Sequence, residues 1–422
     1  MELPKFVIMK GFEILKSMFG KSTMPMMPPA AGATPRRPVI AVAPDKFKGT
    51  LTAEEVTSII AGALRDKLDA EVRCYPMADG GEGTAAILAA EMRLEPATAE
   101  THDAYMQPVK VQYFTDGQTA AVDSAAVVGL AMLGNRELDP WHATSYGLGE
   151  MLRQILDTGV REIYVGIGGT ASTDGGAGML QALGARFTDI WGKPVAADRP
   201  ATAADLGNIF MVDFSGMDRR TLRERITVLA DVDVPLTPAG TDLTDYNGLS
   251  AISFAVQKGM SADDLPDLAR ALDNFRHAVD VVLLPPAVQP PFQGAGGGLG
   301  YAFRRVLKCT AHAGAKYLAA QYGIFTADPQ PDIVITGEGR VDEQSTGGKV
   351  VGTICDEAER RDIPAYIVAG SAGVRLPNMF DTSIYLGVRT PLNHSTAAAS
   401  LRQMLPSIVS SVKCALSDAE KI

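Results

Sequence analysis

The sequence is poor in cysteine, in long apolar runs and in positive charge. Its 4 cysteines in 422 residues form no C-x-x-C pair, so we expect reduced thiols and neither a zinc ribbon nor a disulfide framework. No stretch approaches the roughly 18 unbroken apolar residues of a membrane-spanning helix. A net charge of −10 argues against a general affinity for nucleic acid or an anionic membrane. We therefore expect small-molecule partners and a cytoplasmic location.

Several catalytic motifs are also missing. The histidines form no H-x-x-x-H pair, and no G-x-S-x-G marks a hydrolase serine. The phosphate-binding motif G-x-x-x-x-G-K-[ST] fails at 347–349, because Val350 follows "GGK" where a hydroxyl residue is required. Cys309 and His312 have C-x-x-H spacing on a segment that we predict to be helical. Without a second pair of ligands, we expect them to have a core or surface role.

The N-terminal 38 residues differ from the rest. The segment 5–21, "KFVIMKGFEILKSMFGK", is basic and weakly amphipathic, but Lys10 interrupts its apolar core, unlike a secretory signal. The following "MPMMPPAAGATPRRP" is rich in proline, which prevents regular structure. We predict a disordered extension and linker over 1–38, with an organelle-targeting segment as the alternative.

From Val39 onward, short β-rich runs alternate with helical segments. Thr52 and Glu55 have the spacing of a capping box at the start of the first helix. Two alternating runs flank Asp116-Gly117 and predict a β-hairpin. Strands that alternate with helices favour an α/β fold with mainly parallel sheets flanked by helices.

The loops that follow the predicted strands share glycine and carboxylate residues. They are "APDKFKGT" (43–50), "ADGGEGT" (78–84), "GIGGTASTDGGAGM" (166–179), "ADVDVPL" (230–236) and "TGEGRVDEQSTGGK" (336–349). In parallel sheets such loops gather at one edge, where bare amides can converge on phosphate. We expect the loop 166–179 to lie at the surface of such a site, not in the core. The alternative is that its glycines serve tight packing only.

A dinucleotide site is a competing interpretation of the same loop. Gly166, Gly168 and Ala171 fit G-x-G-x-x-A, and Asp189 follows at about the expected distance. That motif requires a helix to begin within the glycines, whereas 174–178 prolongs the loop. We therefore disfavour a nicotinamide dehydrogenase.

Eight blocks of the sequence resemble the bacterial glycerate kinase family, which includes the glycerate 2-kinase of glucarate and glyoxylate metabolism. In order they are "APDKFKGTLTAEEV", "PMADGGEGT", "TSYGLGEML", "GIGGTASTDGGAGMLQALG", "ADVDVPL", "QKG", "GAGGGLG" and "DIVITGEGRVDEQSTGGK". The match runs from about Val39 to Ala399. The resemblance implies phosphorylation of D-glycerate by ATP, on the 2-hydroxyl and with Mg²⁺. It also implies two α/β domains, one built from 39–100 and 286–405 and one inserted at 101–285, with the active site in the cleft between them.

Three blocks depart from the family pattern. Val234 stands where the family usually has Asn, Asp123-Ser124-Ala125 replaces Glu-Met-Ala, and Thr173 replaces another Asn. Neighbouring carboxylates and glycines are kept, so loss of activity does not follow. A kinase of another small hydroxy acid and an inactive nucleotide-binding homologue remain alternatives, and a homodimer is an expectation.

Phosphoryl transfer requires positioning and charge neutralisation, and candidate residues follow from that demand. Asp174 is our first choice of base, as the only acid in the most glycine-dense loop, and Asp45 is the second. Lys48 is the catalytic candidate of the two lysines that flank Phe47, and either of them could reach the transferred phosphate. The candidate ligands of phosphate or substrate are Lys46, Gly80, Gly81, Gly83, Gly168, Gly169, Thr170, Gly175, Gly176 and Arg340. The candidate metal ligands are Asp79, Glu82, Asp231, Asp233 and Asp342.

Overall fold

The computed structural model describes residues 36–223, 225–237, 250–342, 345, 348–372, 384–385 and 394–419. Nearly all of the predicted extension at 1–38 lies outside this range, as do parts of the loop 336–349. Residues 38–422 form one compact unit.

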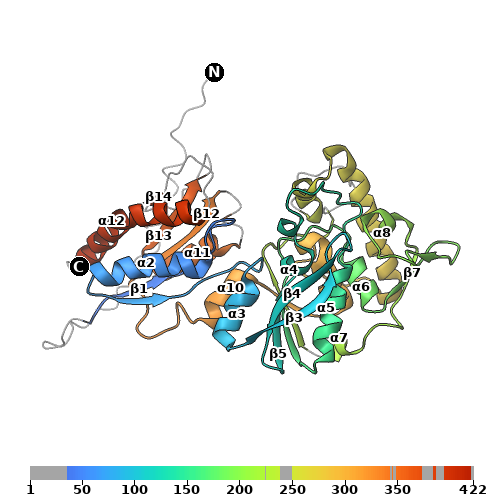
Figure 1. The fold of residues 1–422 in the computed structure, drawn as a ribbon, viewed down its shortest axis with the longest axis horizontal. Coiled ribbons are helices and arrows are strands. Elements are labelled where there is room, and N and C mark those ends of the chain that lie inside the picture. The colour runs from blue at the N-terminus through green and yellow to red at the C-terminus, as the bar shows by residue number, and fades with distance from the viewer. Residues whose placement is uncertain are drawn as a thin grey trace, which may run out of the picture. The chain divides into compact units, whose positions relative to one another are not determined.

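The first sheet is entirely parallel (Figure 1). Its strands, in spatial order, are β14 (Ile384–Tyr385), β13 (Ala365–Ala372), β12 (Ile333–Val341), β1 (Val39–Val42) and β2 (Glu71–Cys74). In its centre Ile40 pairs with Ile333 on one side and Val72 on the other. The strands on both sides of β1 therefore end at the same edge as β1.

The second sheet is mixed. Its strands, in spatial order, are β11 (Thr310–Ala313), β10 (Arg225–Ala230), β6 (Glu162–Gly166), β5 (Thr119–Asp123), β4 (Pro108–Thr115) and β3 (Glu95–His102). The first four strands are parallel, and β4 and β3 continue the sheet in antiparallel pairing. A small antiparallel sheet contains β8 (Pro194–Val195), β7 (Arg186–Thr188) and β9 (Met211–Asp213).

Helices connect most of these strands. The α-helices are α2 (Ala53–Lys67), α3 (Thr84–Met92), α4 (Ala125–Val128), α5 (Tyr146–Asp157), α6 (Ala177–Ala182), α7 (Arg220–Arg223), α8 (Leu265–Leu283), α9 (Leu299–Tyr301), α10 (Gly314–Gln321), α11 (Val350–Glu359) and α12 (His394–Ala419). The short 3-10 helices are η1 (Ala131–Leu133), η2 (Ala203–Asn208), η3 (Ala251–Phe254), η4 (Val256–Lys258), η5 (Ala262–Asp264) and η6 (Ala295–Gly298), and η7 (Ala302–Val306) is a π-turn.

Alternate residues of β1 belong to different cores. Ile40 and Val42 pack with α2 and α12, whereas Ala41 and Ala43 pack with α3, α10 and α11. The latter core also contains Ala121 and Leu229 of the second sheet. The largest core lies between the second sheet and α5, α6, α8 and the segment 299–307. β1 is thus buried on both faces, as is typical of strands in parallel sheets.

The structure confirms the predicted fold class. The hairpin at Asp116-Gly117 is present between β4 and β5, and Thr52 and Glu55 form the capping box of α2. The helical assignment of the Cys309–His312 segment is wrong: residues 310–313 form β11, which pairs with β10. The predicted boundaries 39–100, 101–285 and 286–405 stay a prediction.

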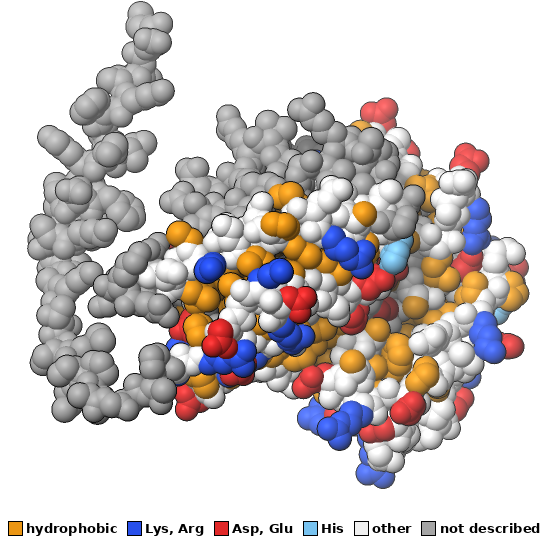
Figure 2. All heavy atoms as spheres, turned by 60° about the vertical axis from the view of Figure 1, so that its left-hand side comes forward, with side chains coloured by type: hydrophobic (Ala, Val, Ile, Leu, Met, Phe, Trp, Pro, Cys, Tyr) orange, Lys and Arg blue, Asp and Glu red, His pale blue; other side chains and the backbone are white. Residues whose placement is uncertain are grey.

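The surface carries charges of both signs. On the face drawn in Figure 2, Lys and Arg side chains stand singly or in small groups among acidic and hydrophobic ones. Within the described ranges, no helix is long and apolar enough to cross a membrane. All four cysteines are free thiols.

Candidate active site at the strand ends

The turn after β1 separates its two lysines. Lys46 points towards the next loop: its Nζ donates to the backbone O of Glu82 at 2.7 Å and lies 4.0 Å from Oδ1 of Asp45. Lys48 is exposed, because the chain turns back at Gly49, where φ is +75°. The structure therefore brings Asp45, Lys46 and the loop after β2 together and places Lys48 at the tip of the turn.

The segment after β2 runs across the carboxyl ends of the second sheet. A Cβ at Gly80 would lie 2.7 Å from the carbonyl carbon of Ala230, and a Cβ at Gly314 would lie 2.4 Å from that of Asp79. Only glycine allows backbones to approach so closely. This approach places Asp79, which is 9% exposed, beside the ends of β10 and β11.

Four carboxylates, here called the acid cluster, influence one another at these strand ends: Asp45, Asp79, Asp231 and Glu338. Burial raises the pKa of Asp45 to about 7, and the charges of Asp79 and Glu338 add to this rise. Burial also raises the pKa of Asp231 to about 6, with Asp79 adding to the rise and Lys349 opposing it. The pKa of Glu338 is raised, again chiefly by burial. Crowded carboxylates with raised pKa values are typical of functional sites.

Two oxygens of the acid cluster lack a hydrogen-bond partner. Oδ1 of Asp231 and Oε1 of Glu338 are both buried and accept no hydrogen bond from any residue that the structure describes. A buried acceptor without a donor costs free energy, so these two atoms indicate a place where a cation or a ligand donor would be stabilised. Across the described residues, no group of three or more His, Cys, Asp or Glu side chains is arranged to hold a metal ion.

The other predicted metal ligands are less buried than Asp79. Asp233 accepts a hydrogen bond from the N–H of Phe292 at 2.7 Å. Oδ2 of Asp342 lies 3.4 Å from Nε of Arg340, whose side chain is 71% exposed. Glu82 is exposed and contributes its backbone O to the contact with the lysine after β1. Glu82 and Asp233 are therefore exposed, whereas Asp342 is partly buried, as Asp231 and Glu338 are.

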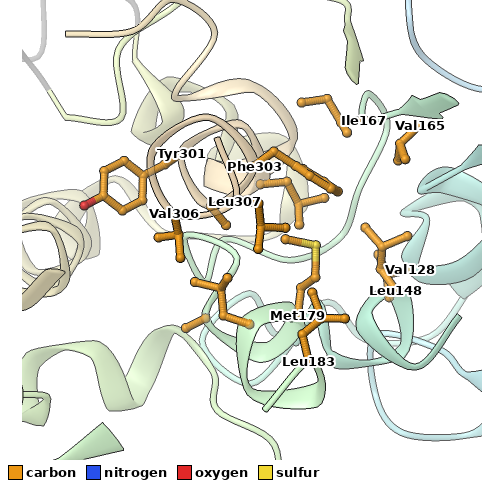
Figure 3. Packing of buried hydrophobic residues seen from close by; sticks show 14 of the residues in the cluster. Val128, Leu148, Val165, Ile167, Met179, Leu183, Tyr301, Phe303, Val306 and Leu307 are labelled. Atoms are coloured by element: carbon orange, nitrogen blue, oxygen red, sulfur yellow. The ribbon is translucent and has the colours of Figure 1, made fainter. Parts of the chain in front are cut away.

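The glycine-rich loop 166–179 is buried except for Gly169, so our expectation that the whole loop lies at the surface is wrong. A Cβ at Gly297 would lie 2.0 Å from the carbonyl O of Ser172, and the N–H of Gly175 donates to the O of Gly297 at 3.1 Å. The apolar core of Figure 3 includes Ile167 and Met179 from this loop together with Phe303. At every glycine of the loop except Gly169, a Cβ would lie within 3.2 Å of another atom, so most of these glycines serve close packing.

Asp174 lies inside this packed loop and is 0% exposed. Its carboxylate accepts hydrogen bonds from the N–H and Oγ–H of Ser145 and from the N–H groups of Gly176 and Gly178. Burial raises the pKa of Asp174, and these hydrogen bonds oppose the rise. The carboxylate thus caps α6 and ties it to the start of α5. Its role as the base stays a prediction, which this geometry disfavours.

A carboxylate of the protein also occupies the start of α3. The N–H groups of Gly83 and Ala85 donate to the two oxygens of Asp123 at 2.8 and 2.9 Å, and the N–H of Gly81 donates to Asp79 at 3.1 Å. Burial raises the pKa of Asp123 to about 7, and its two hydrogen bonds oppose that rise. The helix terminus that could bind phosphate is therefore already bound to the chain itself.

The open end of the glycine-rich loop lies beside the acid cluster. A Cβ at Gly168 would lie 2.8 Å from Oδ2 of Asp231. The next residue, Gly169, is exposed with φ at +77°, and a Cβ there would meet only Ala125, at 3.4 Å. Gly169 exposes bare backbone to solvent, so this is the part of the loop that a ligand can reach.

The structure adds charged residues to which the sequence analysis assigned no role: Asp123, Lys258, Glu338 and Lys349. Lys349 precedes α11, and its charge acts on both Asp231 and Glu338. Lys258 is buried beneath the glycine-rich loop. In the sequence it shows only as the centre of "QKG", since burial of a lone lysine leaves no periodic signal.

Comparison with known proteins identifies the family. The model of the glycerate kinase family matches residues 40–416. The glycerate kinase of Bacillus subtilis (strain 168) and the glycerate 2-kinase of Escherichia coli (strain K12) are each 33% identical over 335 residues, covering 79% of this chain and 85% of the relative.

A solved structure agrees with these matches. It is the crystal structure of a protein assigned as glycerate kinase 2 from Salmonella typhimurium LT2, with a TM-score of 0.72 and 30% sequence identity. The alignment covers 90% of this chain and 100% of that one. The chain therefore belongs to the glycerate kinase family and is a kinase.

Proposed function

We propose that this kinase transfers the terminal phosphoryl group of ATP to the 2-hydroxyl of D-glycerate, giving 2-phosphoglycerate, with Mg²⁺ as cofactor. Relatives at about one-third identity are named glycerate kinases, and one is named glycerate 2-kinase. The observation that carries the proposal is the acid cluster, where carboxylates with raised pKa values lie beside lysines at the strand ends. Phosphoryl transfer requires this combination of a proton acceptor and neutralising charges.

Asp45 is the residue that we propose as the base. Its pKa of about 7 lies near the working pH, where an acceptor is both ionised and basic enough to take a proton. Only 6% of Asp45 is exposed, and Lys46 stands beside it. An ionised Asp45 would accept the hydroxyl proton while Lys46 balances its charge.

Other residues of the site would hold the two substrates and the metal. Asp231 and Glu338 offer buried, unpaired oxygens to Mg²⁺, which is usually bound by one or two carboxylates together with phosphate oxygens. Bound Mg²⁺ would neutralise phosphate charge. Lys349 and the exposed backbone at Gly169 would receive phosphate, and Arg340 would bind the carboxylate of glycerate.

A coupled assay of the purified protein tests the proposal. We expect ATP consumption only when D-glycerate and Mg²⁺ are both present, and phosphorus NMR should show phosphate on the 2-hydroxyl. Glycolate, lactate and L-glycerate are the matched acceptors. Equal turnover with any of them would shift the substrate to another hydroxy acid, and a folded protein that transfers no phosphate would refute the proposal.

We also propose a cytoplasmic location, where an exposed thiol such as that of Cys74 stays reduced. Cell fractionation with an antibody against the native protein would test it. Recovery in a membrane or organelle fraction would contradict it.

A further inference from the structure

Lys258 is a buried cation at the base of the glycine-rich loop. It ends the short helix η4, and 4% of it is exposed. Its Nζ donates to the carbonyl O of Ser172 at 2.6 Å and to Oγ1 of Thr170 at 3.3 Å. Lys258 therefore holds the stretch of loop that directly follows the exposed Gly169.

The fold disfavours the charge on Lys258. Burial lowers the pKa of Lys258 to about 8, although the negative charges of Asp174 and Asp231 oppose this shift. Neither carboxylate is near enough to form an ion pair with Nζ in the described structure. Burying an ammonium group without an ion-pair partner is destabilising, so stability alone does not account for a lysine here.

Arg305 shows how the same protein buries a cation for structural purposes. It is 2% exposed, and its guanidinium donates to Oδ1 of Asp280 through Nε at 3.2 Å and Nη2 at 2.9 Å. Its second acceptor is the carbonyl O of Leu284. The charge of Arg305 is thus matched by a carboxylate, whereas that of Lys258 is not.

A second feature lies next to Lys258. Oγ of Ser172 is fully buried and has no hydrogen-bond partner in the described part of the chain, although the backbone O of the same residue binds Lys258. Four residues before Ser172, Gly168 lies against Asp231 of the acid cluster. The region around Lys258 thus combines a poorly satisfied cation, an unpaired hydroxyl and the open end of the loop, a combination that is common at functional sites.

We propose that Lys258 is a positioning residue for phosphoryl transfer: by binding Thr170 and Ser172 it fixes the backbone at 168–170 for the nucleotide phosphates. Its buried positive charge also favours anions at this end of the loop. The proposal rests on the proposed function for its assignment to phosphoryl transfer. Lys258 itself need not touch the substrate, because it acts through the loop that it holds.

Replacement by methionine tests the proposal, because Lys258→Met keeps the length and removes the charge. We expect the Kd for ATP to rise by about tenfold or more, as on loss of a charged hydrogen bond. The KM for D-glycerate should change far less. The melting temperature should stay within a few degrees of the parent's, because relief of the buried charge offsets the lost hydrogen bond to Ser172. Lys258→Arg, which keeps a cation, should recover part of the ATP affinity.

Arg305→Met is the matched control, since it also removes a buried cation. We expect it to lower the melting temperature and to leave the Kd for ATP unchanged. ATP affinity of Lys258→Met equal to the parent's, or a collapse of its melting temperature with normal ATP affinity, would overturn the proposal. If the parent protein fails to phosphorylate D-glycerate, the proposed function fails, while ATP binding measured by calorimetry still decides the role of Lys258.

Discussion

The glycine-rich loop 166–179 and the acid cluster both lie at carboxyl ends of parallel strands, yet the hydrogen bonding of their carboxylates differs. In the loop, Asp174 is fully buried and all its hydrogen bonds come from the protein. In the acid cluster, Asp231 and Glu338 keep buried oxygens without a partner. The carboxylate of the loop is satisfied by the chain itself, whereas two carboxylate oxygens of the acid cluster have no partner among the described residues.

This difference distinguishes residues that pack the fold from residues that can take part in a reaction. Glycine permits close backbone contact wherever two segments cross, as at Gly297, so a high density of glycine does not by itself indicate a ligand. Unpaired buried oxygens and raised pKa values cost stability, and a fold keeps them chiefly where they serve function. On this criterion the acid cluster is the better candidate for the reaction centre, and Asp45 the better candidate for the base.

The largest effect that we expect comes from Asp45→Asn, which would test whether the acid cluster holds the base. The change removes the proposed proton acceptor with little change in shape, so kcat should fall by roughly 10²–10⁴-fold. Asp116→Asn, in the exposed β4–β5 turn, is the control and should leave kcat unchanged. Near-normal turnover of Asp45→Asn would remove this residue as the base.

The melting temperature of Asp45→Asn, relative to that of the parent, should depend on pH. The pKa of Asp45 is raised to about 7 in the folded protein. The favourable contribution of Asp45 to the free energy of unfolding is therefore complete below its unfolded pKa of about 4, and it is lost as pH rises through 7. Asp45→Asn should therefore gain in melting temperature relative to the parent between about pH 4 and pH 8. A constant difference across this range would show that Asp45 is not held in its buried, partly protonated state.

Asp174→Asn tests whether the buried carboxylate of the loop serves the structure. We expect an effect between those of Asp45→Asn and Gly169→Ala. All four partners of this carboxylate are donors, so the new amide NH₂ would face N–H or O–H groups. We expect a loss of roughly 2–4 kcal/mol in the free energy of unfolding, measured by denaturant titration. Turnover per folded molecule should remain close to the parent's. A variant that is stable and inactive would restore Asp174 as the base.

Much of the fold was predictable from the sequence, because its signals are local. The alternation of β-rich and helical segments gives the parallel sheets, Thr52 and Glu55 mark the start of α2, and Asp116-Gly117 marks the hairpin. The prediction of a helix at Cys309 was wrong for a physical reason. Residues 310–313 form a strand only because β10 lies beside them, and a four-residue strand at a sheet edge has no periodicity of its own.

The candidate site was predictable only in part. The sequence places Asp45, Asp79 and Asp231 after strands, and the parallel topology of the first sheet brings the first two to one edge. Asp231 follows β10 of the second sheet, and the close approach of Gly80 to Ala230 brings it beside them. The sequence does not show which carboxylates are satisfied, because the partners of Asp174 include Ser145 from a distant segment. Lys258 was missed for the same reason, since its burial arises only when the loop folds over it.

The smallest effect should come from Gly169→Ala, at the one exposed position of the glycine-rich loop. Its φ of +77° makes alanine cost about 1–2 kcal/mol, while the space around a Cβ is sufficient. Gly117→Ala is a matched control, because Gly117 has φ at +86° and no neighbour within 4 Å of a Cβ. Both variants should lose similar stability by thermal melting. Only Gly169→Ala should raise the KM for ATP, by roughly three- to tenfold, because its methyl group would stand where a phosphate oxygen approaches the backbone. Equal KM values in the two variants would mean that even this end of the loop serves packing, and phosphate binding would then be assigned to Lys46 and Lys349.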